Sequence, residues 1–239
     1  MNKTMSQKKY IGLDIGSVSV KAVLINERKE ILENHYVRSH GLSVETFLLV
    51  LKDIFNRTHI DDIDGIAITG TGGKFVSELM NIAFVNEVVA HSTATTTIHP
   101  DVSTIIEIGG EDSKLMLIER DSSTQQTKVS DFSMNTMCAA GTGSFLDQQA
   151  TRLGVAIEKE FGELALKSKN PPRIAGRCSV FAKTDMIHLQ QEGTPVHDIV
   201  AGLCYAMARN FKSNIGKGKE FLKPIVIQGG VAANVGMIK

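Results

Sequence analysis

The feature of this 239-residue chain that most constrains its fold is a strand–turn–strand pattern that occurs twice. Two β-rich runs, residues 10–15 and 20–25, flank a four-residue turn of glycine and small side chains. A connection this short favours an antiparallel hairpin over a βαβ unit. The same pattern returns at residues 105–118, around a turn at residues 109–113. Two such hairpins, each followed by helical patterns, predict an α/β chain of two lobes.

The remaining sequence patterns predict the other helices, strands and loops of these two lobes. Apolar residues recur with helical spacing at residues 44–57, 143–153 and 198–215, whereas residues 65–69 and 224–227 have the composition of buried strands. The polar stretch at residues 121–130 indicates an exposed loop. We place the boundary where the hairpin pattern restarts, which gives a first lobe at residues 1–103 and a second at residues 104–239.

Composition excludes several classes of partner. Lysine plus arginine equals aspartate plus glutamate at 26 each, so the net charge of zero offers no electrostatic basis for binding nucleic acid or an anionic membrane. The chain has no apolar run of about 18 residues and no signal-peptide pattern at its start. Three cysteines with no CxxC spacing do not form a disulfide framework. We therefore expect a cytoplasmic protein whose function depends on local sites.

Both hairpin turns contain residues that are suited to binding phosphate. Gly16 and Ser17 lie in the first turn, and Gly109 and Gly110 lie in the second. Glycines and small hydroxyl residues at the end of a strand can direct backbone N–H groups at one anion. The alternative is that each is merely a glycine hairpin, which is a common structure.

Charged residues beside the turns extend this hypothesis to catalysis. Asp14 and Asp112 are candidates to hold Mg²⁺ through water, because Mg²⁺ prefers oxygen ligands and keeps much of its hydration. Lys21 lies on the returning strand and can approach phosphate as a point charge. Glu111 is a candidate to orient the attacking water in hydrolysis. We therefore predict Asp14, Glu111 and Asp112 as catalytic residues.

A third glycine segment closes the predicted nucleotide site. Gly229 and Gly230 follow the last strand and precede a helix start that contains Asn234, an arrangement suited to close approach by a nucleoside. The sequence contains neither GxxxxGK[ST] nor GxGxxG, so the Walker-type and dinucleotide-binding explanations do not apply. Hairpins must hold the phosphates instead.

Two of the three cysteines precede helical patterns. Cys138 and Cys178 each lie just before a predicted helix, where a thiolate meets the positive end of the helix dipole. A [4Fe–4S] cluster needs about four thiolates, so a two-fold dimer would complete the set. The alternative, that either cysteine is a small buried apolar group, stays open on spacing alone. Cys204 lies within an apolar helical pattern and is predicted to be such a group.

Six segments together carry a resemblance to a known family. In chain order they are GLDIGSVSVKAVL, ITGTGG, IIEIGGEDSKL, NTMCAAGTGSFLDQQA, GRCSVFAKTD and IQGGVAANVG. The chain resembles the activator ATPases of 2-hydroxyacyl-CoA dehydratases and benzoyl-CoA reductases, members of the actin, Hsp70 and sugar kinase superfamily. The resemblance covers nearly the whole chain and implies a two-lobed actin-like ATPase (ribonuclease H-like) fold with a nucleotide cleft between the lobes.

The resemblance also implies a specific activity. Such proteins are homodimers with one bridging [4Fe–4S] cluster, which here would be bound by Cys138 and Cys178 of both subunits. ATP or ADP with Mg²⁺ would occupy each cleft, and Gly141, Thr142 and Gly143 would contribute to cofactor binding. ATP hydrolysis would drive transfer of one low-potential electron to an iron–sulfur partner, a 2-hydroxyacyl-CoA dehydratase or related reductase component. A ferredoxin or flavodoxin would supply the electron.

Two departures from the family pattern bear on these expectations. Family members continue beyond the position of Asn234 with elements that complete the second lobe, so we expect a truncated chain. The segments ITGTGG, GGEDSK and RCSVFAKTD also resemble the N-terminal activase modules of long multidomain relatives more than the stand-alone activators. Two alternatives remain, a cluster-free actin-like phosphotransferase and a regulatory nucleotide-binding module. The cysteine pair favours electron transfer, because neither alternative needs two thiolates at helix starts.

Overall fold

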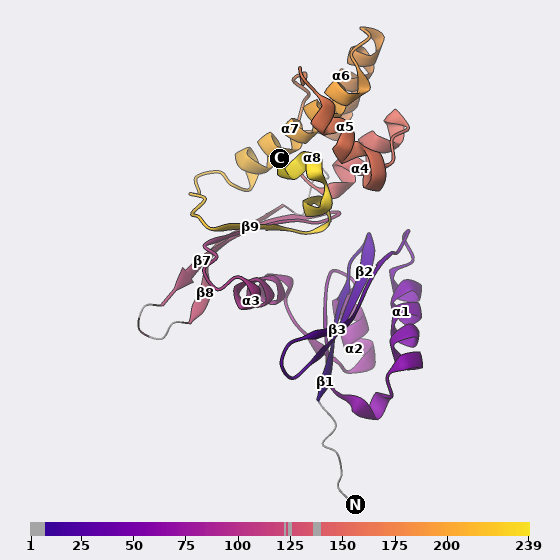
Figure 1. Cartoon of the computed structure of the whole chain (residues 1–239), viewed down its shortest axis with the longest axis vertical. Helices are drawn as coiled ribbons and strands as arrows, with labels where there is room; N and C mark the ends of the chain where they lie inside the picture. The colour runs from indigo at the N-terminus through magenta and orange to yellow at the C-terminus, as the bar shows by residue number, and fades with distance from the viewer. Residues whose placement is uncertain (1–7, 122, 124–125, 136–139) are drawn as a thin grey trace, which may run out of the picture. The chain divides into compact units, whose positions relative to one another are not determined.

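The structure is a computed structural model that describes residues 8–121, 123, 126–135 and 140–239. The chain divides into two compact units, Met1–His91 (unit 1) and Ser92–Lys239 (unit 2). Each unit contains one β-sheet and its own apolar core. The lobes predicted at residues 1–103 and 104–239 stay a prediction. Figure 1 labels helices and strands of both units.

Unit 1 is built on a five-stranded sheet with the order β3-β2-β1-β4-β5. Strands β1, β2 and β3 form an antiparallel meander, and β4 pairs with β1 in parallel. The elements, in chain order, are β1 (Lys9–Ile15), β2 (Ser19–Asn26), β3 (Ile31–Arg38), α1 (Ser43–Arg57), the 3₁₀ turn η1 (Ile60–Asp62), β4 (Ile63–Thr69), α2 (Gly73–Met80) and β5 (Ala83–Phe84). Helix α3 (Glu87–Ile98) begins in unit 1 and ends in unit 2.

The core of unit 1 lies between one face of this sheet and its helices. Alternate residues of β1 and β2 are buried, as the two-residue period of a strand requires. They pack against Phe47, Val50 and Ile54 of α1 and against Val76 of α2. Leu48, which the helical pattern placed on the buried face, is instead 54% exposed. The apolar stripe of α1 is therefore narrower than its sequence suggests.

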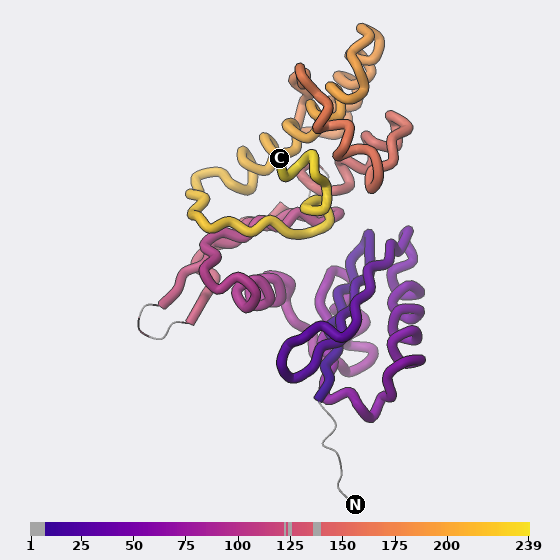
Figure 2. Tube along the Cα trace, viewed as in Figure 1, coloured from indigo at the N-terminus to yellow at the C-terminus, as the bar shows by residue number. Residues whose placement is uncertain are grey.

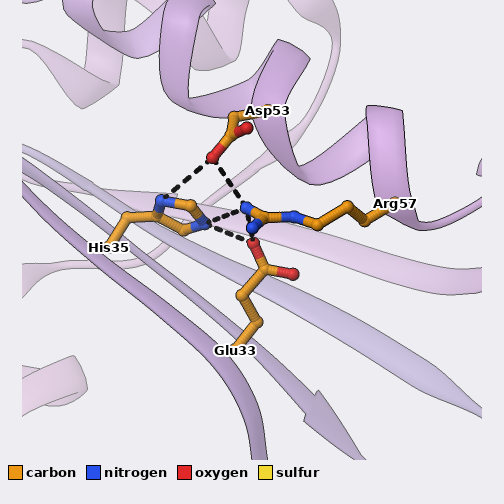
Figure 3. Close-up of polar contacts among 4 residues, drawn as sticks. All are labelled: Glu33, His35, Asp53 and Arg57. Carbon is orange, nitrogen blue, oxygen red and sulfur yellow. Dashed lines mark hydrogen bonds and ion pairs between the residues drawn. The ribbon is translucent and has the colours of Figure 1, made fainter.

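A cluster of charged side chains joins α1 to strand β3. Figure 3 shows Glu33 and His35 of β3 facing Asp53 and Arg57 of α1. Arg57 binds Glu33 Oε1 at 2.5 Å and Asp53 Oδ2 at 2.6 Å, and His35 Nε2 lies 2.5 Å from Glu33 Oε1. Ligand atoms of Glu33, His35 and Asp53 also lie within 4.8 Å of one another. Because the Arg57 guanidinium already pairs with both carboxylates, the cluster is an ion-pair network that fixes the helix to the sheet.

Unit 2 is built on a four-stranded sheet with the order β8-β7-β6-β9. It repeats the unit 1 design, because β6, β7 and β8 form an antiparallel meander and β9 pairs with β6 in parallel. The elements are β6 (Thr104–Ile108), β7 (Ser113–Arg120), β8 (Thr127–Asn135), α4 (Gly143–Leu153), the π-helical turn η2 (Ile157–Phe161), α5 (Gly162–Lys167), α6 (Ser179–Gln191), α7 (Val196–Asn214), β9 (Ile225–Gln228), the 3₁₀ turn η3 (Gly230–Ala233) and α8 (Val235–Ile238).

Helix α7 is the centre of the core of unit 2. Its buried residues include Ile199, Leu203 and Met207, which belong to one apolar cluster with Phe145 of α4 and Leu115 of β7. The tube trace shows helices α4 to α8 gathered on one side of the sheet (Figure 2). Both cysteine-bearing segments precede helices of this layer, α4 and α6.

Most of the predicted elements are confirmed, and one predicted loop is wrong in part. Both hairpins form, and α4 spans the predicted residues 143–153. The loop predicted at residues 121–130 is wrong in its second half, because β8 begins at Thr127. Strand β8 is an edge strand whose side chains are mostly exposed, so its sequence is polar and lacks the alternation of a half-buried strand. Among the described residues, none of the helices has the length and hydrophobicity needed to span a membrane.

Candidate functional site

The first glycine turn joins β1 to β2 and holds four of the predicted residues together. Gly16 N donates to Ser19 O across the turn at 3.0 Å. Asp14 and Lys21 face each other in the β1–β2 register, and Lys21 Nζ lies 2.7 Å from Asp14 Oδ2. Ser17 O accepts a hydrogen bond from Ser39 Oγ at 2.7 Å, which fixes the turn to the end of β3. Both side chains of the ion pair are partly exposed, so a phosphate or a hydrated cation can reach them.

The end of strand β4 supplies a polar group that the sequence reading missed. Thr69 lies opposite Asp14 in the parallel β1–β4 pairing. Its Oγ1 atom is buried and has no hydrogen-bond partner among the described residues. A Cβ atom on the next residue, Gly70, would lie 2.5 Å from Asp14 Oδ1, so only glycine permits this approach. An unsatisfied buried hydroxyl beside a carboxylate and a lysine fits a polar ligand.

The second glycine turn joins β6 to β7 and contains a more deeply buried charge cluster. Lys114 Nζ lies 3.1 Å from Glu107 Oε2 and 2.9 Å from Asp112 Oδ2. The side chains of Lys114 and Glu107 are only 2% and 6% exposed. Gly109 N donates to Asp112 O at 2.9 Å and closes the turn. Glu111, the predicted water-orienting residue, is exposed at the tip of the turn.

The two turns place an acid and a lysine in equivalent positions. Glu107 faces Lys114 in the β6–β7 register as Asp14 faces Lys21 in the first hairpin, and each pair is separated by seven residues. Sequence reasoning assigned Lys21 but overlooked Glu107 and Lys114. The sequence does contain a sign of this pair, because the glutamate at position 107 interrupts the apolar run of β6 seven residues before the lysine.

The third glycine segment packs directly against the second turn. Gly229 has a φ of +90°, and a Cβ atom there would lie 2.4 Å from Ile108 O and 2.9 Å from Glu107 Oε1. Gly230 begins the 3₁₀ turn η3. Asn234, predicted to contact a nucleoside, is the N-cap residue of α8, and its side chain accepts from Gly236 N at 3.0 Å. Its role toward a nucleotide stays a prediction.

The predicted cofactor residues at the start of α4 also meet the second turn. Gly143 N donates to Gly109 O at 2.7 Å, and Gly141 O accepts from Ser113 Oγ at 2.7 Å. Thr142 lies between them as the N-cap residue of α4 and is fully buried. The structure therefore gathers the second turn, the segment 141–143 and Gly229 into one region of unit 2.

The cysteines fall into distinct environments. Cys178 is the N-cap residue of α6 and is partly exposed, and Ala182 N donates to its carbonyl at 3.0 Å. Cys138, the other predicted cluster ligand, lies outside the described residues. Cys204 is buried in α7 as predicted, and burial raises the pKa of its thiol to about 12. Cys178 thus has the partly exposed position at a helix start that is typical of reactive thiolates, and Cys204 does not.

Comparison with known proteins places this geometry in a family. Residues 11–239 match the BadF/BadG/BcrA/BcrD ATPase family. The 2-hydroxyisocaproyl-CoA dehydratase activator of Clostridioides difficile is 31% identical over 231 residues, covering 96% of this chain and 83% of the relative.

Two solved structures are similar to this chain over most of its length. Component A of the (R)-2-hydroxyglutaryl-CoA dehydratase of Acidaminococcus fermentans has a TM-score of 0.86 at 30% identity, covering 96% of this chain and 86% of that one. The activator of the 2-hydroxyisocaproyl-CoA dehydratase from Clostridium difficile was solved with bound ADPNP. It has a TM-score of 0.83 at 30% identity, covering 96% of this chain and 83% of that one. These matches confirm the predicted α/β actin-like ATPase fold class.

Proposed function

Because the chain belongs to the BadF/BadG/BcrA/BcrD ATPase family, we propose that it is an ATP-dependent activator that delivers a low-potential electron to an iron–sulfur partner enzyme. The similar relatives are named as activators of 2-hydroxyacyl-CoA dehydratases, which supports a partner of that class or a related reductase component. One observation carries the electron-transfer part of the proposal. Cys178 occupies the partly exposed start of α6 in a chain that also contains two charged glycine turns.

The nucleotide part of the proposal uses both turns. Lys21 would exchange its partner Asp14 for a phosphate oxygen, which would free the Asp14 carboxylate for hydrated Mg²⁺. Asp112 would hold Mg²⁺ from the second turn, and Glu111 would orient the attacking water. The unpartnered hydroxyl of Thr69 beside Asp14 and the bound ADPNP in a similar activator support this assignment. Gly16, Ser17, Gly109, Gly110, Gly229 and Gly230 would allow the backbone to approach the nucleotide.

The cluster part of the proposal uses the cysteines. Cys138 and Cys178 from each of two subunits would supply the four thiolates that a [4Fe–4S] cluster needs, so the protein would be a homodimer. When bound, this cluster supplies one-electron chemistry at low potential. The start of α6 would stabilise the Cys178 thiolate through the helix dipole. Such a site needs a reducing compartment, so we propose a cytoplasmic protein with a ferredoxin or flavodoxin as electron donor.

Iron content tests the cluster. The protein is purified without oxygen, reconstituted with iron and sulfide, and compared with Cys138→Ala, Cys178→Ala and Cys204→Ala. We expect about four iron atoms per dimer in the parent protein and in Cys204→Ala, and loss of most iron in the other two variants. Equal iron in all four proteins would contradict the assignment and favour the cluster-free ATPase.

Nucleotide dependence tests the coupling. MgATP should accelerate reduction of an added 2-hydroxyacyl-CoA dehydratase, and Asp14→Ala should abolish this acceleration while iron content stays at the parent level. Electron transfer at the same rate with and without MgATP would overturn the proposed role of the nucleotide.

A further inference from the structure

We propose that Ser113 and Asn210 are positioning residues that connect the second glycine turn to both cysteine-bearing segments. This inference deepens the proposed function and rests on it. The two residues act on protein backbone and do not contact the nucleotide or the cluster in the proposal. The contacts that carry this inference all lie within unit 2, among its described residues.

The first connection runs from the turn to the start of helix α4. The first amide groups of a helix have no partners within the helix itself. In α4 two of them are satisfied by the turn, because Gly143 N donates to Gly109 O at 2.7 Å and Ser144 N donates to Gly110 O at 2.8 Å. A displacement of the turn on nucleotide binding must therefore displace the start of α4 or break these bonds.

Ser113 adds a side-chain contact to this connection. Its Oγ atom donates to Gly141 O at 2.7 Å, and the residue is fully buried at the start of β7. Gly141 is three residues after Cys138 in the sequence. Ser113 therefore holds the backbone of Gly141, just before α4, and ties it to the strand that leaves the turn.

The second connection runs through Asn210 on α7. This side chain is 2% exposed and lies against both segments. Its Nδ2 atom donates to Gly176 O at 2.5 Å, two residues before Cys178. Gly141 lies so close that a Cβ atom there would be 2.6 Å from Asn210 Oδ1, and its φ of +94° also favours glycine. One buried amide thus contacts both Gly141 and Gly176, which lie three residues after Cys138 and two residues before Cys178 in the sequence.

Helix α7 holds the Cys178 segment at two further points. Arg209 Nη2 donates to Ile174 O at 2.8 Å. A Cβ atom on Gly176 would lie 2.3 Å from Ala206 O, so the backbone of the segment rests directly on the helix. Close-packed interiors resist continuous deformation, so a movement of Gly141 against Asn210 is expected to reach Gly176 and the start of α6.

Thiol labelling of the intact, cluster-free chain tests the connection. In a Cys138→Ser background, Cys178 is the reactive thiol, because Cys204 is buried with a raised pKa. Its alkylation rate by iodoacetamide is measured with and without MgADPNP. We expect a nucleotide-dependent change of about fivefold or more, the lower end of typical couplings between sites. Ser113→Ala should reduce this change to less than half while MgADPNP still binds in calorimetry.

Two further variants complete the design. Ser130→Ala removes an exposed serine hydroxyl that donates to Leu117 O at 3.2 Å in the same sheet, and it should keep the full response. Asn210→Asp replaces the donor facing Gly176 O by an acceptor, and it should speed labelling without nucleotide and abolish the response. Circular dichroism establishes that each variant is folded.

The outcomes separate this inference from the proposed function. A full nucleotide response in Ser113→Ala and Asn210→Asp would overturn the positioning roles. Bound MgADPNP with no change in labelling of the background protein would also overturn them, while the nucleotide site would stand. Failure of MgADPNP to bind the background protein would contradict the proposed function itself.

Discussion

The two hairpin lysines show how environment divides the roles of equivalent residues. The Lys21 side chain is 39% exposed and pairs with the Asp14 carboxylate, so phosphate can compete for it. Lys114 is 2% exposed and bridges Glu107 and Asp112. A buried cation between two carboxylates cannot leave without stranding negative charge in the interior. We infer that Lys21 is the exchangeable cation and that Lys114 fixes the second turn.

This difference predicts unequal stability effects for one substitution. Lys114→Met should lower the free energy of unfolding by about 3 kcal/mol or more, because it leaves the buried Glu107 carboxylate without this cation. Lys21→Met, the matched control in the equivalent position, should cost about 1 kcal/mol or less. Urea denaturation of both variants measures the difference. Similar costs for the two would contradict the structural role of Lys114.

Cys204 predicts a pH dependence of stability. The folded state keeps this thiol protonated up to about pH 12, whereas the unfolded chain loses the proton near pH 9.0. The unfolded state therefore binds fewer protons in this window, and the stability contributed by Cys204 is present below pH 9.0 and is lost as pH rises toward 12.

Cys204→Ala should remove this alkaline loss. Relative to the parent protein, its free energy of unfolding should rise by about 2 kcal/mol between pH 8 and about pH 10.5, since each pH unit is worth about 1.4 kcal/mol. Met207→Leu, in the same helix and without a titrating group, should keep a constant difference from the parent. Parallel curves for Cys204→Ala and the parent would refute the prediction. Urea titrations at each pH provide the measurement.

At the scale of elements, the attachment of α1 to β3 depends on the Glu33, His35, Asp53 and Arg57 network (Figure 3). Arg57→Met should lower the free energy of unfolding by about 1 kcal/mol at low salt and by less at high salt, because partly exposed ion pairs are weak and screened. Lys9→Met removes a single pair with Asp62 at 3.5 Å in the same unit and should have a smaller effect. Urea denaturation of both variants at two salt concentrations measures these effects. A loss of stability in Arg57→Met that does not depend on salt would indicate lost packing rather than lost ion pairs.

Some elements of the fold could be predicted from the sequence and others could not. The first two strands of each meander were predicted from their β-rich apolar runs. Buried residues alternate along β1 and β2, and they form nearly continuous runs in β6 and β7. Strands β3 and β8 were missed because they are edge strands with mostly exposed side chains. Helix α3 was missed as well, and its sequence is rich in threonine, a residue of low helix propensity.

The candidate site, like the fold, was predicted from the sequence only in part. The glycine turns, Asp14, Lys21 and Asp112 were found because their residue types stand out in an apolar strand pattern. Thr69, Ser113 and Asn210 gave no such signal. Their importance comes from tertiary contacts, such as that of Asn210 with Gly176 34 residues away, which spacing in the sequence does not encode.

At the scale of the whole molecule, the proposed function requires one nucleotide to engage turns that belong to two separate units. Hydrogen exchange can test this requirement directly. MgADPNP should slow exchange of backbone amides at residues 14–19 in unit 1 and at residues 109–114 in unit 2. Lys21→Met should abolish the protection in both segments, although the substitution lies only in unit 1, because binding is a property of the shared ligand. Arg57→Met, also in unit 1 but in the α1–β3 network, should keep both protections. Continued protection of residues 109–114 in Lys21→Met would show that the second turn binds nucleotide independently and would contradict a shared site.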